Sequence, residues 1–124
     1  MKISVIGAGN VGATCAMRIL ESGIANVVLL DKYEGVAKGK AEDLMDAASI
    51  IGHGKTIIGT ANYEDTSSSD IVVITAGFPR KPGMTREELL AKNVSIVSEV
   101  AENIAKFSKN TIIIVVTNPL DIMT

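Results

Sequence analysis

The chain has 124 residues, which is about the length of a single domain built around one hydrophobic core. Hydrophobic residues make up 47% and charged residues 21%, values typical of globular proteins that argue against wholesale disorder. The 12 Lys plus Arg and 14 Asp plus Glu leave a net charge of -2, which gives no reason to expect nucleic acid or a membrane as partner.

One cysteine and one histidine exclude an internal disulfide and a His-based metal cluster. The apolar runs are far shorter than the roughly 18 residues of a transmembrane helix. The N-terminus enters a strand-like run directly, without the pattern of a signal peptide. We therefore expect a reducing, cytoplasmic setting.

Apolar runs rich in β-branched residues predict five strands, the third of them weak. They cover residues 3–6, 27–30, 56–60, 71–74 and 112–116. The runs are mostly continuous rather than alternating, which is typical of strands buried on both faces of a parallel sheet. Helical patterns lie between them, from about Asn10 to Gly23, over residues 37–51 and over residues 85–108.

This order of elements predicts an α/β fold, a Rossmann-type doubly wound parallel sheet with strand order 3-2-1-4-5. The sequence stops shortly after Asn118-Pro119, with no strand to follow. We therefore expect a domain that is incomplete at its C-terminal end.

A glycine-rich motif, Gly7-Ala8-Gly9-Asn10-Val11-Gly12, separates the first strand from the first helix. In this context G-x-G-x-x-G favours dinucleotide binding, because the second glycine lets a pyrophosphate approach and the helix N-terminus attracts it. Asp31 follows the second strand, 19 residues beyond Gly12. A carboxylate there can accept both hydroxyls of an adenosine ribose and repels a 2′-phosphate, which favours NAD over NADP.

The segment after the fourth strand, residues 75–86, contains two prolines and two glycines and is predicted to be a loop at the ligand-binding edge of the sheet. Arg80 and Arg86 lie on it, and two guanidinium groups suit a substrate with two carboxylates. From spacing alone, a solvated basic loop remains an equal alternative. Asn118, after the last strand, places an amide in the same crevice.

These motifs together resemble the lactate/malate dehydrogenase family. The resemblance rests on residues 7–12, Asp31, residues 76–86, Asn93 and residues 117–121, and it spans nearly the whole chain. It implies an NAD-dependent oxidoreductase that transfers hydride reversibly between (S)-malate or oxaloacetate and NAD(H), with a place in the tricarboxylic acid cycle. In that family the position of Arg80 is commonly Gln in lactate dehydrogenases and Arg in malate dehydrogenases. Lactate dehydrogenase and a non-catalytic dinucleotide-binding module remain the alternatives.

The resemblance also implies roles for the matching residues. Substrate is expected to contact Arg80, Arg86 and Asn118, with Arg86 polarising its carbonyl. The expected cofactor-binding residues are Gly7, Ala8, Gly9, Asn10, Val11, Gly12, Asp31, Asn93, Val116, Thr117 and Asn118. No metal is expected.

The same resemblance places the proton-relay His, its Asp partner and a carboxylate-anchoring Arg beyond Thr124. Residues 1–124 are then an NAD-binding domain without its catalytic domain, expected to bind NAD(H) weakly and to turn over no malate. The complete enzyme is expected to be a homodimer or homotetramer, with the helix around residues 35–51 as a candidate interface. His53 is expected on a surface loop and Cys15 in the core.

Overall fold

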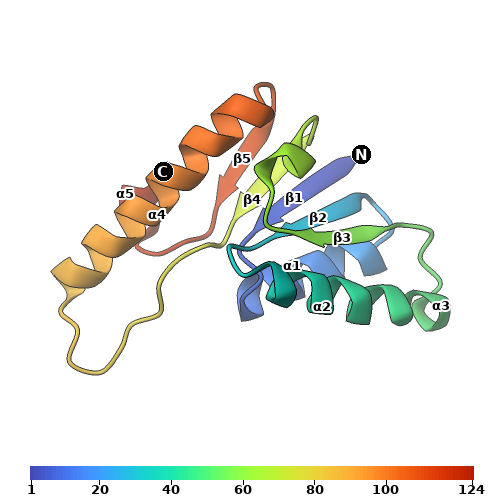
Figure 1. Ribbon diagram of the computed structural model, residues 1–124, viewed down its shortest axis with the longest axis horizontal. Coiled ribbons are helices and arrows are strands. Elements are labelled where there is room, and N and C mark those ends of the chain that lie inside the picture. Colours follow the sequence, from blue (N-terminus) through green and yellow to red (C-terminus); the bar gives the residue numbers. More distant parts are fainter.

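The five predicted strands form one parallel sheet (Figure 1). The computed structural model describes residues 1–124, apart from the side chain of Ser49. The strands are β1 (Lys2–Ile6), β2 (Asn26–Leu30), β3 (Ile57–Thr60), β4 (Ile71–Ile74) and β5 (Ile112–Val115). Their order is β3-β2-β1-β4-β5 with every neighbouring pair parallel, which confirms the predicted doubly wound sheet.

Helices provide the crossovers between these strands. They are α1 (Asn10–Glu21), α2 (Glu34–Asp46), α3 (Ala48–Ile51), α4 (Arg86–Phe107) and α5 (Leu120–Met123), with a 3-10 turn, η1 (Tyr63–Thr66), between β3 and β4. The single helix predicted over residues 37–51 is therefore divided in two. The division is a local tightening, because the N–H of Ile50 donates to the carbonyl of Ala47, three residues back.

The sheet lies between two helical layers, with α1 and α2 on one side and α4 on the other (Figure 1). Side chains alternate along β1, so Ile3 and Val5 pack against the α1 and α2 layer while Ile6 joins the core beneath α4. On the face covered by α1 and α2, helix α2 comes very close to β3. A Cβ at Gly59 would overlap the Ala37 carbonyl, so only glycine permits this approach.

Strand β5 departs from the expectation of burial on both faces. Ile112, Ile113 and Ile114 are 65%, 45% and 46% exposed. The reason is position, because β5 is an edge strand paired only with β4, and the core under α4 is formed mainly by side chains of β1, β2 and β4. No helix among the described residues is both long enough and apolar enough to cross a membrane.

Candidate cofactor and substrate site

The predicted site residues gather at the carboxyl edge of the sheet. Because all five strands are parallel, the segments that follow them leave from the same edge. The glycine-rich motif follows β1, Asp31 follows β2, residues 75–85 follow β4 and residues 116–119 follow β5. In Figure 1 the segment between β4 and α4 extends well away from the sheet as a long loop. The topology thus brings together motifs that are more than a hundred residues apart in the sequence.

The three glycines of the motif have different surroundings. Gly7 has φ +104°, and a Cβ there would lie 2.8 Å from the Ala76 nitrogen. A Cβ at Gly12 would overlap the Gly7 carbonyl oxygen, so this glycine is needed for α1 to pack against the turn. A Cβ at Gly9 would meet nothing within 4 Å. The fold itself therefore requires Gly7 and Gly12, whereas Gly9 leaves open space at the mouth of the loop.

The N-terminus of α1 offers unused hydrogen-bond donors beside that space. Gly9, the N-cap residue, makes no side-chain cap, and no described residue accepts a hydrogen bond from the N–H of Gly9, Asn10, Val11 or Gly12. Unpaired N–H groups and the positive end of a helix dipole together favour an anion. The open space at Gly9 and these donors fit the pyrophosphate of a dinucleotide such as NAD.

Asp31 is held against the same loop. Its Oδ2 accepts a hydrogen bond from the Ala8 N–H at 2.7 Å, and its Oδ1 accepts one from the Tyr33 N–H at 3.0 Å. Each oxygen retains a lone pair, so the carboxylate can still accept hydroxyl donors. Half-buried Tyr63 lies within electrostatic reach: burial mainly, and then the charges of Glu99 and Asp31, raise the pKa of its phenol. Asp31 is therefore an oriented, partly exposed carboxylate next to the predicted phosphate loop.

Asn93 connects the two segments predicted to contact substrate and nicotinamide. This α4 side chain is 4% exposed; its Oδ1 accepts from the Phe78 N–H at 2.7 Å and its Nδ2 donates to the Asn118 carbonyl at 3.0 Å. Buried Thr117 adds a second link, since its hydroxyl donates to the Ala76 carbonyl at 2.7 Å. Val116 beside it is 42% exposed. The structure thus brings these residues together, and their contact with cofactor stays a prediction.

The two predicted substrate arginines lie on the outer part of the site. Both Arg80 and Arg86 are exposed, and neither forms an ion pair with a described residue. Arg86 is the first residue of α4, which begins with a capping box formed by Thr85 and Glu88. A cation at a helix N-terminus is electrostatically unfavourable, so this position suits ligand binding better than helix stability.

Sequence reasoning missed two residues that shape the loop. Thr75, directly after β4, donates its hydroxyl to the carbonyls of Ile6 and Gly7, both at 3.1 Å. Lys40 of α2 donates from Nζ to the Ala8 carbonyl at 2.6 Å. The position of Thr75 after a strand was a usable signal, whereas Lys40 sits among other charged residues of α2 and nothing in the sequence distinguishes it.

The remaining polar candidates lie away from this edge or are engaged otherwise. The Nδ1 of His53 lies 3.1 Å from the Lys55 carbonyl, in the loop after α3. Burial raises the pKa of the Cys15 thiol, which fits the predicted packing role rather than a reactive one. Within the described part of the chain, no group of three or more His, Cys, Asp or Glu residues is arranged to hold a metal ion.

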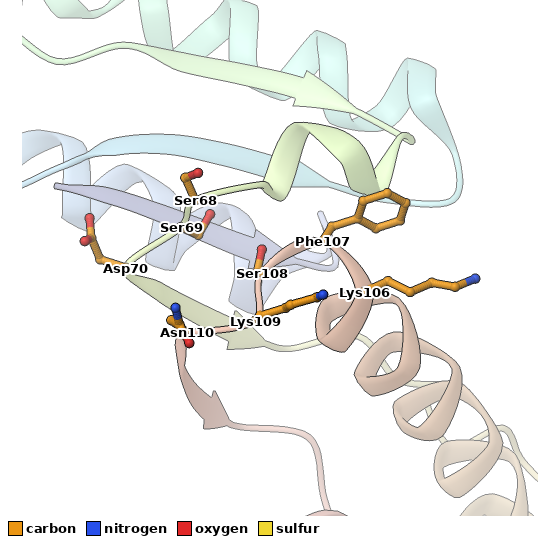
Figure 2. Close-up of a pocket in the computed structure, with 8 residues that line it drawn as sticks. All are labelled: Ser68, Ser69, Asp70, Lys106, Phe107, Ser108, Lys109 and Asn110. Atoms are coloured by element: carbon orange, nitrogen blue, oxygen red, sulfur yellow. The ribbon is translucent and has the colours of Figure 1, made fainter.

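A cavity of about 500 Å³ lies at the opposite, amino edge of the sheet (Figure 2). It is lined by Ser68, Ser69, Asp70, Lys106, Phe107, Ser108, Lys109 and Asn110. The hydroxyls of Ser69 and Ser108 both donate to the Thr66 carbonyl, at 2.7 and 2.6 Å. Figure 2 shows Lys106 extending away from the labelled serines. The cavity therefore contains none of the predicted site residues, and its buried hydroxyls are already used.

Comparisons with known proteins identify the family and agree with the fold. The family model described as "lactate/malate dehydrogenase, NAD binding domain" matches residues 1–124. The malate dehydrogenases of Bacteroides fragilis and Flavobacterium frigidimaris are 55% and 58% identical, over 99% and 100% of this chain and 40% of each relative. A malate dehydrogenase structure from Archaeoglobus fulgidus in complex with NADH superposes with a TM-score of 0.95 at 42% identity, covering 100% of this chain and 42% of that chain.

This chain therefore spans about two fifths of the length of the curated relatives it matches. The family match covers every residue that carries the sequence resemblance. The chain belongs to the lactate/malate dehydrogenase family, and its residues 1–124 correspond to that family's NAD-binding domain.

Proposed function

We propose that this chain forms the cofactor-binding part of an NAD-dependent malate dehydrogenase. The N–H groups at the start of α1 bind the pyrophosphate, the Asp31 carboxylate binds the adenosine ribose, and the nicotinamide lies toward Asn93 and residues 116–118. The bound cofactor supplies hydride transfer, whereas the protein's contribution is to orient the two reactants and to complement their charges.

The observation that carries the substrate assignment is the pair of exposed arginines on the loop after β4. Arg80 and Arg86 have no ion-pair partner among the described residues, and their guanidinium groups can each pair with one carboxylate. Oxaloacetate and malate carry two carboxylates, whereas pyruvate and lactate carry one. The relatives with 54–58% identity are named malate dehydrogenases, which supports the same choice. We infer that Arg80 binds the second carboxylate and that Arg86 polarises the reacting carbonyl.

The test is Arg80→Gln in the full-length protein, compared with Lys81→Gln as a control on the same loop. Arg80→Gln should lower kcat/KM for oxaloacetate by about 100-fold or more, because an unpaired carboxylate in a closed site costs about 3–5 kcal/mol. Its relative rate with pyruvate should rise, while Lys81→Gln should keep the original preference. An unchanged ratio of oxaloacetate to pyruvate activity would remove Arg80 from substrate recognition and return lactate dehydrogenase or a non-catalytic module to consideration.

We further propose that the full-length protein is a cytoplasmic homo-oligomer. The single cysteine supports a reducing compartment. Exposed apolar side chains on α2 and α3 support an interface between copies, with Val36, Ile50 and Ile51 at 45%, 88% and 44% exposure. Ile50→Glu should shift the mass measured by light scattering toward the monomer, whereas Ile24→Glu, after α1, should not. Equal masses for Ile50→Glu and the unmodified protein would exclude this face.

A further inference from the structure

Lys40 reaches the glycine-rich motif from a helix that begins more than twenty residues later in the chain. Its Nζ donates a hydrogen bond to the Ala8 carbonyl at 2.6 Å, and the contact is partly buried. This carbonyl lies four residues before Gly12, so it is the oxygen that would accept the Gly12 N–H if α1 began one residue earlier. Instead, this oxygen accepts its hydrogen bond from the ammonium of Lys40.

The backbone N–H of Ala8 is bound by a group of opposite charge to Lys40, the carboxylate of Asp31. This N–H donates to the Asp31 carboxylate at 2.7 Å, and Ala8 is fully buried. The neighbouring carbonyls also have protein donors, because the Gly7 oxygen accepts from Thr75 and the Gly9 oxygen accepts from the Ala13 N–H. Every carbonyl from Gly7 to Gly9 is thus turned toward the protein.

The N–H groups of residues 9–12 show the opposite behaviour, since no described residue accepts a hydrogen bond from them. A loop that binds a pyrophosphate must present N–H groups and keep its carbonyl oxygens away, because these oxygens repel an anion. Both requirements meet in the Ala8–Gly9 peptide: its carbonyl accepts a hydrogen bond from Lys40, and its N–H donates to no described residue.

We propose that Lys40 is a positioning residue for the cofactor pyrophosphate. Its ammonium holds the Ala8 carbonyl away from the phosphates and thereby keeps the N–H groups of residues 9–12 directed at them. Its charge adds to the positive potential of the α1 N-terminus. This inference rests on the proposed binding of NAD's pyrophosphate by the loop. It adds Lys40, which lies outside the glycine-rich motif, to the residues on which that binding depends.

The test compares Lys40→Met with a matched control, Lys38→Met, in the full-length protein. Lys38 is on the same helix and pairs with Glu34 at the surface at 2.9 Å, so the control removes the same charge without touching the loop. Three probes separate the subsites: NADH by fluorescence, ADP-ribose by calorimetry, and adenosine by NMR titration. Only the first two contain a pyrophosphate.

Lys40→Met should weaken NADH and ADP-ribose by about tenfold or more, as expected for loss of a hydrogen bond to a charged group. Adenosine affinity should change by less than about twofold, as should all affinities in Lys38→Met. Lys40→Arg, which keeps a cationic donor, should recover most of the loss. Lys40→Gln, which keeps a neutral donor, should fall in between and provides a milder variant if Lys40→Met unfolds.

Three outcomes would overturn the proposal: unchanged ADP-ribose binding in Lys40→Met, an equal loss in Lys38→Met, or a loss of adenosine binding as large as that of ADP-ribose. The second outcome would mean that the loss of affinity comes from the change in net charge. The third would mean that the substitution distorts the whole binding site. Failure of the unmodified protein to bind ADP-ribose would instead contradict the proposed function itself.

Discussion

Asn93 accepts a hydrogen bond from the backbone N–H of Phe78 at 2.7 Å, while the other end of the same amide donates to the Asn118 carbonyl at 3.0 Å. One buried side chain of α4 therefore fixes the base of the arginine-bearing loop to the segment after β5. The relative position of the predicted substrate residues on the two segments depends on this link, together with the bond from the Thr117 hydroxyl to the Ala76 carbonyl.

Replacing Asn93 with Ala should loosen both segments at once. It leaves a partly buried N–H and a carbonyl without their partners, which should lower the free energy of unfolding by about 1–3 kcal/mol in urea titrations. Asn93→Asp keeps the acceptor for Phe78 but loses the donor to Asn118. Asn103→Ala on the same helix, where the amide only contacts the Glu99 carbonyl, should cost less than about 0.5 kcal/mol. Similar costs for the Ala variants at 93 and 103 would contradict the linking role.

The motif glycines give a second prediction. Substitution by alanine should mainly affect NADH affinity at Gly9 and mainly affect stability at Gly12. Gly9→Ala places its Cβ in open space, so the unfolding free energy should change by less than about 1 kcal/mol. The same methyl group occupies the predicted phosphate space, so NADH affinity should fall by about tenfold or more. Gly12→Ala overlaps the Gly7 carbonyl and should mainly destabilise the fold, by more than about 2 kcal/mol. Thermal melts and NADH fluorescence on both variants check this; a Gly9→Ala protein with normal NADH affinity would place the phosphates elsewhere.

Most of the fold was predictable because its signals are local. Apolar runs and the glycine punctuation identify the strands, and parallel connections between them leave few allowed orders. Asp31 and the glycine-rich motif could be located because each directly follows a strand, and the end of a parallel strand is where ligands bind. Their contact through the Ala8 N–H then follows from the adjacency of β1 and β2.

The remaining features depend on packing that no single segment encodes. Asn93 lies within the buried stripe of α4 with Val97, Val100 and Ile104, and only the tertiary structure shows that its amide is satisfied by two loops. Lys40 reaches the loop from α2, a helix that packs closely against β3 at Gly59. The exposure of β5 comes from its place at the sheet edge, where the predicted strand order also puts it, whereas its β-branched run taken alone predicts burial on both faces.

Cys15 gives a prediction about pH. Burial raises the pKa of its thiol, so the reactive thiolate is disfavoured in the folded protein. Alkylation by iodoacetamide should be slower at neutral pH than in the urea-unfolded chain, and its pH profile should be displaced upward. The stability that the neutral thiol contributes is fully present below the unfolded pKa and is lost as pH rises through the folded one. Cys15→Ala should therefore reduce the fall in stability at alkaline pH. Equal alkylation rates for folded and unfolded protein would show that the thiol is exposed.

Asp31 should set the preference for NADH over NADPH. Its carboxylate already holds the Ala8 and Tyr33 N–H groups, which leaves one lone pair on each oxygen for the ribose hydroxyls and a negative charge to oppose a 2′-phosphate. Asp31→Ser should weaken NADH binding by roughly 1.5–3 kcal/mol and narrow the gap to NADPH.

The matched control for Asp31→Ser is Asp70→Ser. Asp70 accepts a backbone N–H from Lys2 at the same 2.7 Å distance but lies at the opposite edge of the sheet. Losing it changes the net charge by the same amount, so both cofactor affinities should stay within about twofold of the unmodified protein. Fluorescence titrations with NADH and NADPH distinguish the two positions. If Asp31→Ser left both affinities unchanged, the ribose would have to bind elsewhere, and the carboxylate's contact with Ala8 would serve only to shape the loop.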